Sequence, residues 1–525
     1  MGAKAHAVNS EQLVISALRN AQFIKALADL PLIQETNVIE AAAEFDVRGF
    51  MESKFFRPSH PVGSTLTTGP TGPKRFREQD WNYSLGVRKR VATGGEFELS
   101  QQIGHLDNNS EFLDPKSQGN AKFKLSFSQP LLNGAGKAYN TSLIVLAEVD
   151  ERVAWDKLST QLQDYLLDVV RAYWELYLQR AVLQQKIRHF QRAQVILTEL
   201  EDRREIDAAE SQIARARAAV TSRRSEIIRA ETAVRNAESQ IRALVNAPDL
   251  VDSGQIELVP TEVPAHDLIA VSPRDALVSA LENRPEIDEA IQQIRSAGVR
   301  LDVAENELKP VLDLVLETYV SGLRGSSDIG QALADQFTLG EPSYSAGLLF
   351  EMPLHNRAAR ARYLRRELEM RQLLSQFRGT VEGLMSEVEI AVREVETTYH
   401  EMQSRYQAMV ANEIDMNSLT ERWRLLPGDD RSASFVLEDI LDAQDRLVAE
   451  ELQFVSAQVS YTLSLARLNR ALGVLLQTEQ VDAYRAVQCG LPKLLLDKPE
   501  AEVDIVEENL PIDLPPPELV PFQEP

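Results

Sequence analysis

Apolar residues recur at every seventh position in four stretches of the chain, and the sets have five to seven members. Strict seven-residue repeats of this length predict coiled coils with a left-handed twist. In one stretch, the second apolar position of successive heptads is occupied by Ala216, Arg223 and Ala230. The small alanines at this position allow helices to pack closely. The four sets run over Leu162–Leu197, Ile213–Ile241, Leu374–Met416 and Ile440–Leu475.

Glycine and proline are distributed very unevenly along the chain. Residues 137–247 contain neither of them, and nor do residues 429–472. Stretches without a helix breaker predict long helices. We therefore predict two hairpins, each formed by a long helix and a return helix. Their ranges are about 137–202 with 207–246, and about 356–425 with 436–476.

A shorter helix is predicted ahead of each hairpin, over about 8–43 and about 273–308. A long helix reaches about 100 Å at 1.5 Å per residue. A return helix followed by a short helix has nearly the same length. We expect the shorter helices to stack end to end beside the long ones.

Five segments alternate between apolar and polar residues, which predicts half-buried strands of about 8–11 residues. A turn between two of them is supplied by Thr93 to Gly95. This length suits a strand that crosses a bilayer at a tilt, but alternation alone fits equally a soluble β-domain with one wet face. The apolar positions are Trp81, Tyr83, Leu85 and Val87; Phe97, Leu99 and Ile103; Phe123, Leu125 and Phe127; Leu312, Leu314 and Leu316; and Tyr344, Ala346, Leu348 and Phe350.

The chain contains an internal repeat. Pro130 and Asn133 correspond to Pro353 and Asn356, and the same number of residues separates the members of each pair. A second pair of matching segments, residues 17–24 and 280–287, is separated by a larger number of residues. The first half therefore holds about 40 additional residues, which we place within residues 58–121. This insertion contains the predicted hairpin 81–104.

Composition limits the classes of function. The net charge of −23 argues against a general nucleic-acid binder. Cys489 is the only cysteine, which excludes disulfides within the chain and a cysteine-based zinc site. The sequence contains no run of 18 apolar residues, so it predicts no transmembrane helix. A transmembrane β-barrel is not excluded, because its strands alternate between apolar and polar residues and form no such runs. Seven scattered histidines and the absence of catalytic motifs predict no enzyme, metal site or cofactor.

The pattern resembles the outer-membrane efflux proteins, the TolC-like family, over about residues 8–476. The resemblance rests on the order of the elements and on short motifs. These are the joint Gln129–Gly136, its twin Pro353–Arg357, the segment Ala172–Leu176, and the segment Asn283–Ile287 with Ala304 and Pro310 beyond it.

The resemblance implies a homotrimeric channel-tunnel. A shared outer-membrane β-barrel would continue as an α-barrel of coiled-coil hairpins across the periplasm. Its expected partners are a periplasmic adaptor (membrane fusion) protein, an inner-membrane pump and outer-membrane lipid. The function would be a passive exit duct for tripartite efflux or type I secretion. The alternative from the heptads alone is a soluble coiled-coil adaptor or tether without channel activity.

The strand–helix joints are expected to be structural. Pro130 and Pro353 are expected at the ends of strands, because proline has no backbone N–H to donate and none is needed there. Asn133 and Asn356 are expected to cap the first helical turns. Gly134 and Gly136 relax the backbone at the first joint, whereas Arg357 occupies the second, so the joints need not bend alike.

The helix reversals are the candidate gate and adaptor-binding tips. Asp429 and Asp430 could form a threefold ring of carboxylates that favours cations, or be a solvated acidic turn. The remaining candidates for tip and adaptor contacts are Asp202, Arg203, Arg204, Arg422, Arg424 and Arg431.

These predictions divide the chain into nine segments. Since no secretory signal is visible, we expect the chain to begin after a removed signal. Whether hairpin 81–104 joins the barrel or forms an external flap stays open, as do the substrate and the cognate pump. The segments are an N-terminal helix (1–44), strands of repeat 1 (45–130), hairpin 1 (131–246), an equatorial linker (247–272), an opening helix (273–309), strands of repeat 2 (310–353), hairpin 2 (354–476), an equatorial segment (477–496) and a disordered acidic, proline-rich tail (497–525).

Overall fold

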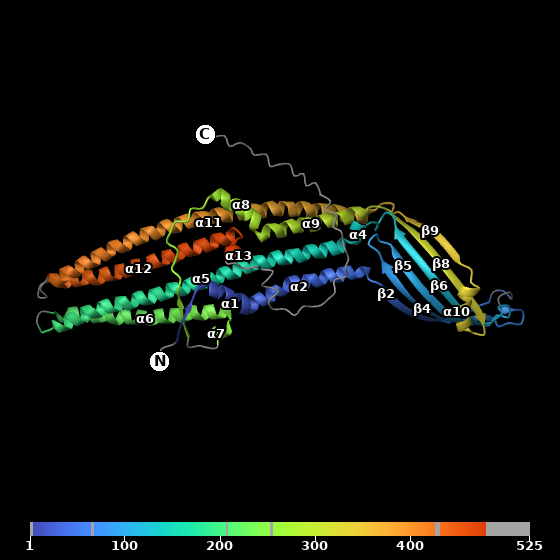
Figure 1. Cartoon of the computed structure of the whole chain (residues 1–525), viewed down its shortest axis with the longest axis horizontal. Coiled ribbons are helices and arrows are strands. Elements are labelled where there is room, and N and C mark those ends of the chain that lie inside the picture. The colour runs from blue at the N-terminus through green and yellow to red at the C-terminus, as the bar shows by residue number, and fades with distance from the viewer. Residues whose placement is uncertain are drawn as a thin grey trace, which may run out of the picture. The chain divides into compact units, whose positions relative to one another are not determined.

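The structure is a computed structural model that describes residues 4–62, 64, 68–205, 208–251, 256–425 and 431–478. All of these residues belong to one compact unit, Met1–Gly490. Within this unit, long helices run side by side and a curved sheet stands at one end of them (Figure 1). The predicted tail 497–525 and most of the equatorial segment 477–496 lie outside the described residues.

The two predicted helical hairpins are present. The first consists of α5 (Ser142–Asp202) and α6 (Glu210–Val245), and the second of α11 (Arg357–Leu425) and α12 (Arg431–Ala471). Their heptad residues are buried or half-buried, except for Leu374 at the start of the third set, which is exposed. The short helices α4 (Lys137–Asn140), α7 (Pro248–Val251) and α13 (Leu475–Thr478) accompany them.

Each predicted opening helix is broken into two, so the prediction of single helices was wrong. The first splits into α1 (Ser10–Asn20) and α2 (Gln22–Ala42), and the second into α8 (Pro273–Asn283) and α9 (Pro285–Asn306). The breaks fall at Ala21 and Arg284, which are extended with ψ of 123° and 119° and occupy equivalent places in the two repeats. Proline disfavours helical backbone in the residue before it, which explains the second break. The short 3-10 helix η1 (Ala43–Phe45) follows α2.

One antiparallel sheet contains the strands of both repeats. Its order is β2-β4-β5-β6-β8-β9, with the short β3 beside β4. Hairpin 81–104 therefore belongs to the sheet, because β4 and β5 lie between β2 and β6. Several strands are longer than predicted, and β4 has 16 residues. The bounds are β2 (Arg48–Phe56), β3 (Ser59–Pro61), β4 (Arg75–Arg90), β5 (Glu96–Asn108), β6 (Ser117–Pro130), β8 (Val311–Gly325) and β9 (Ser343–Glu351).

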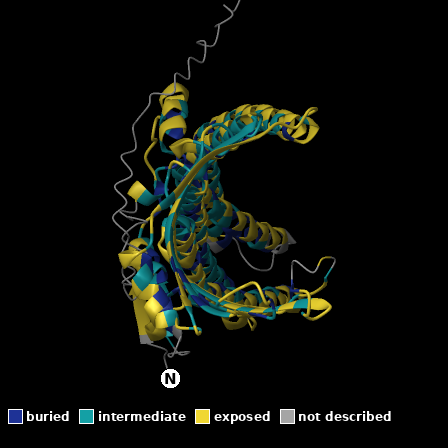
Figure 2. Ribbon diagram, turned by 90° about the vertical axis from the view of Figure 1, so that its right-hand side faces the viewer, coloured by how far each residue is buried: buried dark blue, intermediate teal, exposed yellow. Residues whose placement is uncertain are grey.

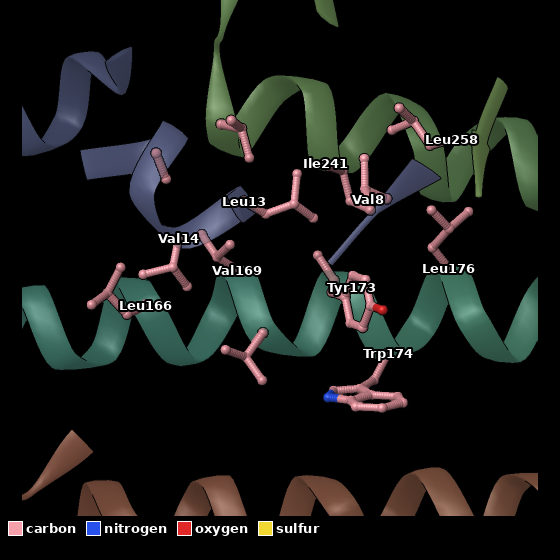
Figure 3. Close-up of a cluster of buried hydrophobic side chains, with 14 of the residues drawn as sticks. Val8, Leu13, Val14, Leu166, Val169, Tyr173, Trp174, Leu176, Ile241 and Leu258 are labelled. Carbon is pink, nitrogen blue, oxygen red and sulfur yellow. The ribbon is translucent and has the colours of Figure 1, made fainter. Parts of the chain in front are cut away.

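A second, two-stranded sheet was not predicted. It pairs β1 (Lys4–Val8) in parallel with β7 (Ile256–Pro260), which joins the start of the chain to the linker 247–272. Val8 and Leu258 from this sheet pack with Val14, Tyr173 and Ile241 of α1, α5 and α6 in the largest buried cluster (Figure 3). The segment Ala172–Leu176 thus lies in the core of the helical part.

Two buried tyrosines hold the linker against the long helices. The hydroxyl of Tyr173 accepts a bond from the backbone N–H of Glu262 at 3.1 Å. The hydroxyl of Tyr461 accepts from the N–H of Ile269 at 3.2 Å and donates to the carbonyl of Asp267 at 2.7 Å. The linker is therefore fixed to α5 and to α12.

A helix between the last two strands was also not predicted. This helix, α10 (Ile329–Thr338), lies at the end of the sheet remote from the long helices (Figure 1). Asp328 caps it by accepting a bond from the N–H of Gln331 at 3.0 Å.

Candidate pore wall, joints and gate

The register of the sheet sorts its side chains onto two faces. Val87 pairs with Leu99, Leu99 pairs with Leu125, and residues paired across strands lie on the same face. All five predicted alternating segments place their apolar residues on this apolar face, where Leu85 and Leu348 are 63% and 68% exposed. The apolar residues of this face are Met51, Phe55, Trp81, Tyr83, Leu85, Val87, Phe97, Leu99, Ile103, Phe123, Leu125, Phe127, Leu312, Leu314, Leu316, Val320, Tyr344, Ala346, Leu348 and Phe350.

The opposite, polar face carries charged and amide groups. Lys124 Nζ lies 3.2 Å from Glu317, and Lys122 Nζ lies 3.7 Å from the centre of the Tyr319 ring. Arg88 donates to Glu98 at 2.8 Å. Figure 2 shows the sheet as an open arc, so a single copy encloses no pore.

The first joint is built around the end of α9. Pro130 is the last residue of β6, and Gly134 and Gly136 adopt the left-handed region with φ of 77° and 98°. The side-chain amide of Asn133 donates to the carbonyl oxygens of Glu307 and Lys309 at 3.4 and 3.2 Å.

The second joint uses an asparagine in a related way. Pro353 follows the end of β9, and Arg357 is the first residue of α11. The amide of Asn356 donates to the carbonyl oxygen of Leu308 at 3.0 Å. Both asparagines therefore donate to the turn that directly follows α9, and the expectation that their side chains cap the following helices was wrong. Asn356 has φ of 42°, so the joints differ in backbone conformation.

The structure describes part of the predicted tips. Asp202, Arg204 and Arg422 are exposed. The guanidinium of Arg203 lies 5.8 Å from the centre of the Trp423 ring, which places a residue of the first tip against the second hairpin. Asp429 and Asp430 lie outside the described residues, and the side chains of Arg424 and Arg431 are not described.

A partly buried ionic cluster joins the two hairpins. Arg223 of α6, 4% exposed, donates to Gln444 at 2.7 Å and to Asp445 of α12 at 2.9 Å. Nε2 of the buried His189 in α5 lies 2.9 Å from the same Asp445 carboxylate. Hydrogen bonding to His189 and the charge of Arg223 hold the pKa of Asp445 below its usual range. The sequence analysis missed this cluster, although Arg223 stood out as a charge in an alanine seam.

A second ionic cluster lies at the break between α8 and α9. The fully buried side chain of Arg284 donates to Glu387 of α11 at 2.7 Å. Arg470 of α12 donates to Asp164 of α5 at 2.7 Å and lies 3.2 Å from Glu286. This cluster connects both hairpins to α9.

Several acids crowd the contact between α5 and α9. Burial, together with the charges of the neighbouring Asp288 and Glu289, raises the pKa of Asp156 to about 6. Lys157 Nζ lies 3.5 Å from Glu289. The Asp156 carboxyl therefore titrates near the lower end of physiological pH.

Among the described residues, no three His, Cys, Asp or Glu side chains are grouped as metal ligands would be. No helix in the described ranges is both long and apolar enough to cross a membrane.

No family model and no curated protein sequence matches the chain. Solved structures do match. The outer-membrane channel OprN is 15% identical, with 88% of this chain and 89% of that chain covered and a TM-score of 0.65. The CmeC outer membrane channel of Campylobacter jejuni is 13% identical, with coverage of 91% and 88% and a TM-score of 0.63. The outer membrane protein VceC of Vibrio cholerae is 18% identical, with coverage of 88% and 96% and a TM-score of 0.61.

The fold is that of the TolC-like outer-membrane channels. This confirms the fold implied by the sequence resemblance, namely long helical hairpins joined to a sheet region in two repeats. In the TolC-like fold of this chain, the sheet is the candidate pore wall, the two asparagine joints connect it to the helices, and the helix reversals are the candidate gate.

Proposed function

We propose that the chain is an outer-membrane channel-tunnel that serves as the passive exit duct of a tripartite efflux or type I secretion system. The observation that carries the proposal is the single sheet with one mainly apolar face, most of which is exposed. In a bilayer this face would contact lipid and the polar face would line the pore. A soluble adaptor or tether would expose the same apolar face to water, which disfavours that alternative.

The functional channel would be a homotrimer. The sheet ends in two free edges, β2 and β9, and a membrane-spanning sheet must close to satisfy its backbone groups. Six strands from each of three copies give a barrel of 18 strands. Barrels of 16–18 strands leave an aqueous channel. Exposed apolar side chains on the long helix α11, such as Leu364 and Ile390, support packing between copies.

The helical part would cross the periplasm. In this arrangement hairpins 131–246 and 354–476 form the α-barrel, and segments 247–272 and 477–496 form an equatorial belt around it. The tips would meet a periplasmic adaptor protein, through which an inner-membrane pump supplies the energy. The chain itself would catalyse no reaction.

The gate would lie at the tips. Asp429 and Asp430, repeated in three copies, would form a ring of carboxylates that favours cations and narrows the opening. Arg422, Arg424 and Arg431 on the second tip, with Asp202, Arg203 and Arg204 on the first, are the proposed contacts for the adaptor. The Arg203–Trp423 contact supports a closed packing of the two tips.

Single-channel conductance in a planar bilayer tests this function. We expect discrete, cation-selective openings from detergent-extracted protein, and larger openings from the Asp429→Ala, Asp430→Ala variant. A matched control removes two exposed carboxylates elsewhere, with Glu282→Ala and Glu413→Ala. Openings that are unaffected by the tip variant would move the gate elsewhere. A protein that stays monomeric without detergent and never conducts would refute the channel.

A further inference from the structure

Helix α10 packs on the apolar face of the sheet. The rings of Phe337 and of Phe123, an apolar-face residue of β6, are 5.8 Å apart. Gly322 lies on the same face, and a Cβ atom built there would overlap the Ala332 carbonyl and stand 2.6 Å from the Gln336 nitrogen. The helix backbone therefore lies directly on β8, and only glycine allows this approach.

The burial pattern of α10 differs from that of a surface helix in water. Its buried side consists of Ala332 and Gln336, both 0% exposed. One exposed flank presents Leu333 and Phe337, followed by Leu339, which are 40%, 63% and 70% exposed, whereas Gln331 and Thr338 are exposed on the other flank. A helix packed on a core in water buries its apolar residues and exposes its polar ones.

The buried glutamine and the aspartate of α10 have polar partners on the sheet. The side-chain amides of Gln101 and Gln336 bond each other in both directions, at 3.2 and 3.0 Å. Gln101 belongs to the row of β5 that includes the apolar Leu99 and Ile103. Asp335 forms an ion pair with Arg324 of β8. Gln101, Gln336 and Asp335 thus have polar partners on the sheet side of the helix, as an apolar solvent demands.

The helix also extends the apolar band of the sheet. On β8 the apolar face runs from Leu312 to Val320, and the next position outward is Gly322. Nine residues of a strand tilted by about 40° span about 23 Å of bilayer thickness, and apolar bands of outer-membrane barrels are about 25 Å tall. Where Gly322 supplies no side chain, α10 supplies Leu333 and Phe337 instead.

We infer that the apolar flank of α10, formed by Leu333 and Phe337 with Leu339 just beyond the helix, binds the hydrocarbon of the outer leaflet of the membrane. The helix then acts as a lateral anchor on the lipid side of the barrel, at its end remote from the periplasmic helices. This inference rests on the proposed function, because it requires the apolar face of the sheet to contact lipid.

Spin labels test the inference in the full-length protein reconstituted into liposomes. Single cysteines replace Leu333 or Phe337 in a Cys489→Ser background, and label accessibility is compared between oxygen, which concentrates in lipid, and a water-soluble nickel complex. We expect both positions to favour oxygen several-fold over the nickel complex. Leu348→Cys on the apolar face and Ser126→Cys on the polar face are the matched lipid and water controls.

The outcomes separate the inference from the proposed function. If Leu348→Cys favours oxygen while both α10 positions favour nickel, α10 lies in water and the inference fails alone. If Leu348→Cys also favours nickel, both fail. Low accessibility to both reagents at α10 would mean that protein covers it, which also overturns the inference.

A second measurement avoids the spin label. Phe337→Trp adds an indole on the apolar flank of α10, and lipids brominated on their acyl chains quench nearby tryptophans. We expect the variant to show a larger quenched fraction of fluorescence than the parent protein, whose Trp81 already lies on the apolar face. An unchanged quenched fraction would overturn the inference.

Discussion

Asn133 and Asn356 occupy equivalent positions of the two repeats, and both donate their side-chain amides to carbonyl oxygens of the turn that follows α9. Residues 307–309 form this turn, and the two amides satisfy backbone carbonyls within it. One turn thereby fixes both strand–helix joints at once, although the two asparagines lie in different halves of the chain.

We predict that the two joints tolerate alanine differently. Asn133→Ala removes hydrogen bonds worth about 1 kcal/mol. Asn356→Ala removes a similar bond and also places alanine at a φ of 42°, so its loss of stability should reach about 2 kcal/mol. Asn356→Gly should lie between them. Thermal unfolding measures the difference, with the exposed Asn37→Ala as control, and equal losses at the two joints would contradict the prediction.

The partly buried cluster around Arg223 should couple the two hairpins. Asp445→Ala leaves the Arg223 guanidinium buried without its carboxylate, and we expect a loss of about 1–2 kcal/mol because Asp445 itself is largely exposed. Asp442→Ala, on the exposed side of α12, should change little. A double-mutant cycle with Arg223→Leu isolates the coupling, and additive losses would show that there is none.

The same cluster should weaken in acid. The folded-state pKa of Asp445 lies below its unfolded value, so its contribution to stability is present above the unfolded pKa and disappears as pH falls through the folded one. The loss caused by Asp445→Ala should therefore shrink when unfolding is measured below about pH 4. A loss that is independent of pH would contradict the ionic origin.

Asp156 should show the opposite dependence on pH. Its folded-state pKa of about 6 exceeds the usual 3.8, so its contribution to stability is lost as pH rises from 3.8 towards 6. We expect Asp156→Asn to stabilise the protein at pH 7 by about 1 kcal/mol, since the group is only half-buried. The gain should vanish near pH 4. The exposed Asp150→Asn is the control, and an equal gain at both pH values would refute the assignment.

Gly322 should be the position that seats α10. Gly322→Ala adds a Cβ that overlaps the backbone of α10, so we expect faster hydrogen exchange of the helix amides and a loss of about 1–3 kcal/mol. Gly347→Ala on β9 meets no atom within 4 Å and should leave α10 unchanged. Protected α10 amides in the first variant would show that the close approach is not required.

Closure of the barrel between copies predicts a specific cross-link. Ser53→Cys on β2, combined in turn with a cysteine at Tyr344, Ala346 or Leu348 on β9, should yield disulfide-linked dimers and trimers for one register in the Cys489→Ser background. All four positions lie on the apolar face. Ser53→Cys with Leu125→Cys on the central β6 should yield none. Absence of linked copies at every register would contradict the shared barrel.

Patterns within single elements predicted much of the fold. Heptads and missing breakers located α5, α6, α11 and α12, and alternation located five strands and their apolar sides. The break at Ala21 has no local signal, because Gln22 follows where the second repeat has Pro285. The helix α10 was not predicted, because its large apolar residues are exposed and lie between glycine-rich turns. The pairing of β1 with β7 joins segments that lie far apart in the chain, so no local pattern predicts it.

The candidate site was predicted less completely for the same reason. The sequence motif located Asn133 and Asn356, but their partners lie in the turn after α9, and no local pattern could predict this pairing. Arg223 was visible as a charge among alanines, yet its partners Gln444 and Asp445 belong to the other hairpin. The gate candidates Asp429 and Asp430 remain predictions.

The inserted strands have a consequence for how such pores can change in size. The chain leaves the helices through α2 into β2 and must return to them from β6 into α4, so any insertion between these strands must preserve their directions. Only insertions of strand pairs do so. The circumference of a trimeric barrel would therefore grow in steps of six strands, while the number of tunnel helices stays the same. Whether the number of inserted strands is even, and not how long the insertion is, decides which insertions a duct of this kind accepts.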